Sequence, residues 1–276
     1  MRHIRFGCPV GLVLTMAMAI PSVKGATLAY SWSDAFSGGD RILYEIVLET
    51  GLATPVHFVG GQSIEGAAAL PDGRIVGLDP WNEKYWQMMP TPALISQPSL
   101  TGVDAGMDYD VTSDTLYALT GGTFSHFESA YLYALDPDTG APELIGFDLA
   151  HYADSIAISP SGQAFAADRV FKHRLYQVNL TTGQLVPGPP IRTPTGSLIL
   201  GGGGLAFSED GTLWMLDADS GAIRQVDPST GIATYVSTIS VHESGYEWES
   251  LAIPIPEPSA FACLALGALF LRRRAR

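Results

Sequence analysis

Four acidic residues stand close before copies of one short apolar phrase in this chain. Glu65, Asp154 and Glu249 directly precede copies that begin with Gly or Ser, and Asp104 lies two residues before another copy. If the copies are equivalent strands, their carboxylates converge and repel one another unless a cation lies between them. Hard oxygen ligands of this kind suit calcium. The sequence therefore predicts either a calcium site or a hydrated acidic pore that holds no fixed ion.

Other motifs give weaker support for a functional site. Asp108, Asp110 and Asp114 form an Asp-x-Asp-x-x-x-Asp pattern without the Gly and distal Glu of an EF-hand loop, so Asx turns are the alternative to calcium binding. No Gly-x-Ser-x-Gly elbow is present, and the glycines at 201–204 lack the Lys of a phosphate-binding loop. We predict no catalytic residue, and no cofactor apart from calcium as a candidate.

Two alternating phrases make up the chain between its termini. One phrase is an amphipathic strand that ends in a Thr-Gly turn, and Thr-Gly recurs at 50–51, 139–140, 182–183 and 230–231. The uneven first gap predicts a degenerate copy between Lys84 and Gly102. The other phrase is the small, apolar strand that follows the acidic residues. A repeat of four short strands about every 40–50 residues is typical of propeller blades.

The two ends of the repeat complement each other. The last apolar phrase, Glu249–Ile253, has no second strand after it, whereas the segment 27–51 aligns with 115–140 and has no first strand before it. We therefore predict an all-β, five-bladed β-propeller over residues 26–254, closed by pairing of the N- and C-terminal strands. Six blades are the alternative if the region 84–102 hides another unit.

Both termini have the character of targeting segments, and we predict an apolar helix in each. Residues 1–25 begin with basic side chains and continue into an apolar run and small residues, which is the layout of a secretory signal peptide. Residues 255–276 contain Pro256-Glu257-Pro258, an apolar block at 259–271 and Arg272-Arg273-Arg274. As a helix this block is about 20 Å long, shorter than the roughly 30 Å hydrocarbon core of a bilayer.

The C-terminal segment resembles the PEP-CTERM sorting signal of exported bacterial proteins. The resemblance implies a partner, an exosortase-type processing enzyme that recognises Pro256-Glu257-Pro258 after transient membrane anchoring; a permanent anchor is the alternative. The repeats resemble the β-propeller domains found upstream of such signals, and more loosely the NHL and strictosidine-synthase-like propellers. Glu65-Gly66 is similar to the Glu-Gly motif that opens the metal site of gluconolactonase-type propellers.

The net charge of the chain limits the partners that it can bind. The chain has 15 Lys and Arg against 28 Asp and Glu, and seven of the basic residues lie in the two terminal segments. The remaining domain has a net charge of about −20, which argues against a nucleic-acid partner. We expect a protein of the cell surface or extracellular matrix that binds polysaccharide or surface proteins without catalysis. The alternative is a metal-dependent hydrolase or lactonase at the acidic mouth.

Aromatic residues are the expected contacts for such binding. Trp214 follows an Asp-Gly turn in a predicted strand and is assigned to the core. Seven others fall in or near predicted loops, where exposed aromatic side chains serve sugar or protein recognition. They are Trp81, Tyr85, Trp86, Phe124, Phe127, Tyr246 and Trp248.

Overall fold

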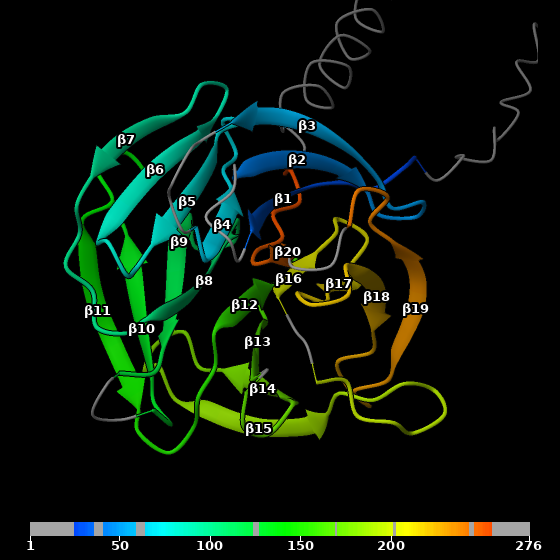
Figure 1. The fold of residues 1–276 in the computed structure, drawn as a ribbon. Coiled ribbons are helices and arrows are strands. Elements are labelled where there is room, and N and C mark those ends of the chain that lie inside the picture. The colour runs from blue at the N-terminus through cyan, green and yellow to red at the C-terminus, as the bar shows by residue number, and fades with distance from the viewer. Residues whose placement is uncertain are drawn as a thin grey trace, which may run out of the picture.

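The computed structural model describes residues 25–35, 41–58, 64–123, 127–168, 170–200, 203–242 and 246–255. These residues form five antiparallel sheets of four strands each, arranged around a common axis (Figure 1). The prediction of an all-β, five-bladed propeller is confirmed, and the six-bladed alternative is wrong. The predicted signal peptide, terminal helices and sorting motif lie outside the described residues. Across the described ranges, no helix has the length and apolar character needed to span a membrane.

Each blade runs from an inner strand at the axis to an outer strand at the rim. Blade 1 contains β20 (Tyr246–Trp248), β1 (Leu28–Ala35), β2 (Ile42–Val47) and β3 (Leu52–Phe58). Blade 2 contains β4 (Gly66–Ala69), β5 (Ile75–Asp79), β6 (Lys84–Met89) and β7 (Ala93–Ser96). Blade 3 contains β8 (Asp104–Asp110), β9 (Thr115–Gly121), β10 (Ala130–Leu135) and β11 (Pro142–Asp148). Blade 4 contains β12 (Ser155–Ile158), β13 (Ala164–Asp168), β14 (Arg174–Val178) and β15 (Leu185–Pro190). Blade 5 contains β16 (Gly204–Phe207), β17 (Leu213–Leu216), β18 (Ala222–Val226) and β19 (Ala233–Thr238).

The degenerate copy predicted within 84–102 is confirmed, since β6 and β7 complete blade 2. Tyr85 and Trp86 were expected in or near loops, but both lie in β6, the third strand of this blade. Tyr85 is fully buried in β6, and its hydroxyl donates a hydrogen bond of 3.0 Å to the carbonyl of Pro137. Burial raises the pKa of Tyr85 well above its ordinary value. The prediction that Tyr85 is a loop aromatic was therefore wrong, because the missing Thr-Gly turn concealed the strand.

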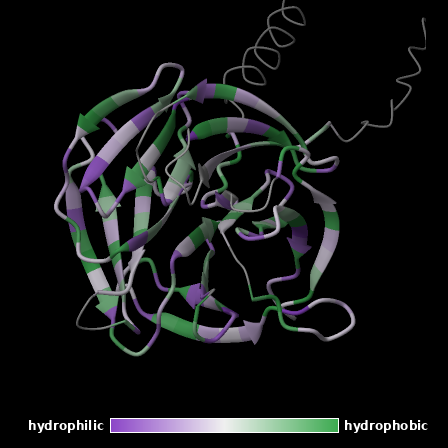
Figure 2. Cartoon of the chain, viewed as in Figure 1, coloured by the Kyte–Doolittle hydropathy of each residue, from purple (hydrophilic) through white to green (hydrophobic). Residues whose placement is uncertain are grey.

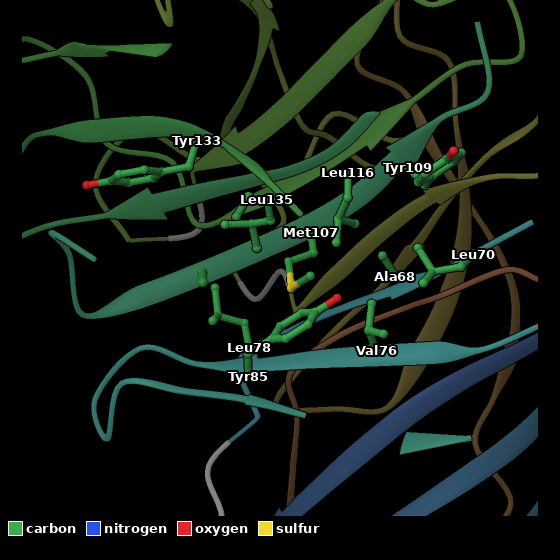
Figure 3. Packing of buried hydrophobic residues seen from close by; sticks show 12 residues of the cluster. Ala68, Leu70, Val76, Leu78, Tyr85, Met107, Tyr109, Leu116, Tyr133 and Leu135 are labelled. Atoms are coloured by element: carbon green, nitrogen blue, oxygen red, sulfur yellow. The ribbon is translucent and has the colours of Figure 1, made fainter. Parts of the chain in front are cut away.

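The core consists of the layers between neighbouring blades. Inner and second strands are mostly buried because a blade packs on each side, as β5 and β17 illustrate with no exposed residue. Figure 3 shows Leu78 and Tyr85 of blade 2 against Met107 and Leu116 of blade 3. Toward the rim the strands mix hydrophilic and hydrophobic residues (Figure 2). The ring is therefore held together chiefly by burial of apolar side chains between the sheets.

The Thr-Gly turns follow the predicted chemistry. The carboxylate of Asp136 accepts hydrogen bonds from the backbone N–H groups of Asp138 (2.9 Å) and Thr139 (2.8 Å). Gly140 then takes a φ of +68°, which closes the turn in a conformation that costs glycine little. This Asx turn holds the third and fourth strands of blade 3 in register.

Blade 1 closes the ring with both ends of the described chain. β20 pairs with β1 through Ser33 and Trp248, and the pairing resumes at Tyr30 and Ala252. The predicted closing strand covered Glu249–Ile253, whereas regular pairing begins earlier, at Tyr246. Two residues lie between the paired positions on β1 and three lie between those on the C-terminal segment, so that segment contains one extra residue, as in a β-bulge. The predicted circular closure is confirmed, with this correction to its bounds.

Candidate functional site

The five inner strands leave almost no space at the axis. A void of about 10 Å³ is lined by residues from all five blades, including Gly66, Gly106, Ser155, Gly204 and Ser250. Such a volume is near the lower limit for one water molecule. The channel therefore has no room for an organic substrate, and any larger ligand must bind at a mouth or on the outer surface.

Close contact between inner strands explains why the repeated phrase so often begins with glycine. A Cβ atom on Gly106 would lie 2.5 Å from the Cα atom of Ser155, and one on Gly204 would lie 2.3 Å from the backbone nitrogen of Leu251. Both distances are shorter than real Cβ contacts allow, and the atoms met belong to the backbone. Glycine therefore permits the narrow axis that five blades require.

At one mouth, the four predicted carboxylates divide between two places. Glu65 and Glu249 line the axial void, from the adjacent blades 2 and 1. Asp104 and Asp154, from blades 3 and 4, meet at the hydroxyl of Tyr152, which contacts Asp104 Oδ2 and lies 3.1 Å from Asp154 Oδ2. A tyrosine hydroxyl has one proton to donate, so it can donate to one of these two carboxylates at a time.

This arrangement does not support the predicted cation site. Within the described ranges, no group of three or more His, Cys, Asp or Glu residues is placed to hold a metal ion. The expectation assumed one ring of converging carboxylates. The structure instead places a tyrosine between Asp104 and Asp154, a contact that repeat alignment did not reveal because Tyr152 lies in the loop before the repeated phrase. The four carboxylates therefore do not form one converging ring, and Asp154 and Glu249 are buried.

The opposite mouth is covered by the end of the described chain. Ile253 packs on the cluster shared by blades 1 and 5, and Ile255 packs on the cluster shared by blades 2 and 3. The segment 253–255 therefore crosses the mouth. It borders one cavity of about 90 Å³ beside Arg74 and another of about 100 Å³ beside Asp108.

Asp108 is the unusual ionisable group at this second mouth. Its carboxylate accepts hydrogen bonds from the backbone N–H groups of Ile158 (2.6 Å) and Tyr109 (2.8 Å). Desolvation outweighs these bonds and, with the nearby Asp110, raises the pKa of Asp108 to about 7. Asp110 is different, because Thr112 and Ser113 donate to it and lower its pKa. The Asp-x-Asp pattern thus contains an Asx turn at Asp110, as the turn interpretation predicts.

The structure confirms some of the predictions about aromatic residues and contradicts others. Trp81 and Phe127 are exposed, by 54% and 62%, and Trp214 is buried in the core, as predicted. Trp248 is wrongly assigned to a loop, because its ring is buried where β20 closes the ring and its Nε1–H donates to His242. Trp86 lies in β6 and is partly buried. The side chains of Phe124 and Tyr246 lie outside the described residues.

Comparison with known proteins supports the fold. No protein-family model matches the chain, and no curated protein matches it in sequence. A solved protein of unknown function from Bacteroides thetaiotaomicron VPI-5482 is similar, with a TM-score of 0.50 and 16% identity over 80% of this chain; the match spans 60% of that protein. A chain in a crystal structure of a nidogen/laminin complex is also similar, with a TM-score of 0.53, 11% identity and coverage of 84% of this chain and 99% of that one. Such low identity shows shared architecture alone.

Proposed function

We propose that this protein is an exported β-propeller that works outside the cell by binding, and that an exosortase-type enzyme processes its C-terminal segment. The small size of the axial void is the observation that favours binding over catalysis. A void of about 10 Å³ has no room for an organic substrate, and within the described residues the carboxylates at the mouth form no group of three or more that is placed to hold a metal ion. The hydrolase alternative has no specific observation in its favour.

The rim of the propeller offers surface for binding. All five outer strands carry exposed large apolar side chains, which are Leu52, Phe58, Leu94, Leu144, Phe147, Val186 and Tyr235. Exposed apolar side chains are common contacts at interaction surfaces. The similar chain in the nidogen/laminin complex is part of a structure of bound proteins, which agrees with a binding role for this architecture. The partners we propose are extracellular polysaccharide or surface protein.

The closure of the ring is compatible with removal of the sorting segment. The last residue that pairs with β1 is Ala252, and the last described residue is Ile255, which packs on the blade 2 and blade 3 cluster. Both come before Pro256. Cleavage at or after Pro256-Glu257-Pro258 would therefore leave in place every strand partner and core side chain of the described residues, and we expect the propeller to remain closed after processing.

Processing and location can be tested in producing cells with and without an exosortase-type enzyme. We expect the full chain to lose its C-terminal segment and to reach the surface or medium when the enzyme is present. A variant with Ala at positions 256–258 should retain its full mass at the C-terminus and stay with the membrane fraction. A matched control, Asp138→Ala, changes an exposed acidic turn residue and should be processed like the wild type.

Two results would count against the proposal. Identical mass and location for wild type and the 256–258 variant would remove the basis for sorting. Turnover of an ester or lactone by the mature protein, together with failure to capture polysaccharide or surface protein, would replace binding with catalysis.

A further inference from the structure

A groove opens between blades 4 and 5 on the face crossed by the segment 253–255. It has a volume of about 360 Å³, within the usual range for small-ligand pockets. Its walls are the turn between β12 and β13 and the turn between β16 and β17. It shares Phe207 and Glu209 with the cavity of about 100 Å³ beside Asp108, so the two spaces are adjoining parts of one surface depression.

Two aromatic rings line this groove. The ring centroids of Phe165 in β13 and Phe207 in β16 lie 5.9 Å apart, with the ring planes tilted by 52°. Both side chains are partly exposed, although Phe207 also packs on the blade 4 and blade 5 core. The pair thus presents apolar ring surface to solvent from two different blades.

The exposure of Phe165 differs from that of the equivalent residues in three other blades. Phe165 pairs with the third residue of its inner strand, Ala157. The residues in the same register in three other blades, Val76, Tyr117 and Trp214, are at most 8% exposed. In blade 1 the equivalent residue, Tyr30, which pairs with Ala252, is also partly exposed, so this position is buried in three of the five blades. What distinguishes Phe165 is that its partly exposed ring lies beside a second partly exposed ring, Phe207, and such a pair offers a contact surface for a ligand.

The polar groups around the rings are mostly hydrogen-bond acceptors. Glu209 and Asp210 place carboxylates at one side, and Gln163 and Ser161 place an amide and a hydroxyl at the other. No lysine, arginine or histidine lines the described walls of the groove. Negative charge without a cation disfavours an anionic ligand, whereas carboxylates bind hydroxyl donors strongly.

We infer that this groove binds a neutral, hydroxyl-rich oligosaccharide. A sugar ring has apolar C–H groups on its faces, which suit the Phe165 and Phe207 rings, and hydroxyls on its rim, which suit Glu209 and Gln163. An extended peptide fits less well, because the groove is bounded by turns and offers no strand edge for β-augmentation. The inference rests on the proposed binding function and assigns a site and a ligand class to it.

Calorimetric titration of the protein purified from producing cells tests the site. The probes are neutral hexasaccharides of glucose and mannose, with hexagalacturonate as the anionic comparison. We expect a neutral probe to bind and Phe165→Leu to weaken it at least tenfold, because leucine keeps the apolar volume and removes the ring. Gln163→Ala, an exposed change, should weaken binding severalfold without altering the melting temperature.

The matched control is Phe171→Leu. Phe171 lies between β13 and β14, is 39% exposed and forms an edge-to-face pair with Tyr152 at 5.3 Å, away from the groove. This variant should bind the probe like the wild type. Equal binding by Phe165→Leu, no binding of either neutral probe at millimolar concentration, or binding of hexagalacturonate alone would each overturn the inference. None of these results alters the sorting and protein-capture tests, so failure of the site is distinguishable from failure of the proposed function.

Discussion

Tyr30 and Ala252 pair through two backbone hydrogen bonds, although they lie near opposite ends of the described chain. The N–H of Tyr30 donates to the carbonyl of Ala252 at 2.7 Å, and the N–H of Ala252 donates to the carbonyl of Tyr30 at 2.8 Å. This pair completes blade 1 and joins the first strand to the last segment. A ring closed in this way has no unpaired inner edge at the junction.

Proline at position 252 should open this junction. Ala252→Pro removes the N–H that bonds to Tyr30 and should destabilise the protein by about 3 kcal/mol, equivalent to a fall of roughly 6–12 °C in melting temperature. Thermal unfolding followed by circular dichroism measures the change. The control is Glu209→Pro, since Pro160 already occupies the same place in the equivalent Ser-x-x-Gly turn of blade 4. Equal melting temperatures for the two variants would show that closure contributes little.

A methyl group at Gly204 should be costly because the inner strands are in contact. Gly204→Ala would place Cβ 2.5 Å from the Cβ of Leu251, so the strands must separate, at a cost of about 1–3 kcal/mol. Urea unfolding gives the free energy. Blade 4 has Ser155 at the same place, and Ser155→Ala should change the free energy of unfolding by less than about 1 kcal/mol. A stable Gly204→Ala variant would contradict the narrow axis.

Asp108 should make stability fall as the pH rises toward neutrality. Its folded-state pKa of about 7 is above the ordinary value of 3.8, so between these values the native state keeps a proton that the unfolded state has lost. The free energy of unfolding therefore decreases through this window. We expect Asp108→Asn to gain stability relative to the wild type between about pH 5 and pH 8 in urea titrations.

Asp136→Asn is the control for this pH effect. Hydrogen bonds, first from the backbone of Thr139, lower the pKa of Asp136. Its contribution is therefore lost only as the pH falls below the ordinary range, and the variant should show a constant offset from the wild type between about pH 5 and pH 8. A constant offset for Asp108→Asn as well would show that Asp108 titrates normally.

Calcium should leave the melting temperature unchanged. The four predicted ligands are divided between two places, and the Tyr152 hydroxyl lies between Asp104 and Asp154. A ligand that binds the native state raises its stability in a saturable way. Melting curves with about 1 mM calcium and with a chelator should therefore coincide. A saturable rise that Glu65→Gln abolishes would restore the cation site and the hydrolase alternative.

Much of the fold could be predicted because its signals are local. The Asp-Pro-x-Thr-Gly turn at 136–140 contains its own capping carboxylate and its own positive-φ glycine, so its geometry can be inferred from five consecutive residues. Closure could be predicted for a related reason, since the segments 27–51 and 249–253 are complementary parts of one repeat. Even the degenerate blade 2 followed from the spacing, although the burial of Tyr85 did not.

The sequence by itself determined the propeller class, the turns and the circular connection, because short-range patterns and a repeating period specify them, whereas the structure decided between five and six blades. Only the tertiary structure decided that Asp104 and Asp154 share Tyr152, that the axis is nearly filled, and that Phe165 meets Phe207 in a groove. The physical reason is that neighbouring blades create each of these features. A side chain's contacts there depend on the distance and angle between two sheets, and no repeat within one strand encodes them.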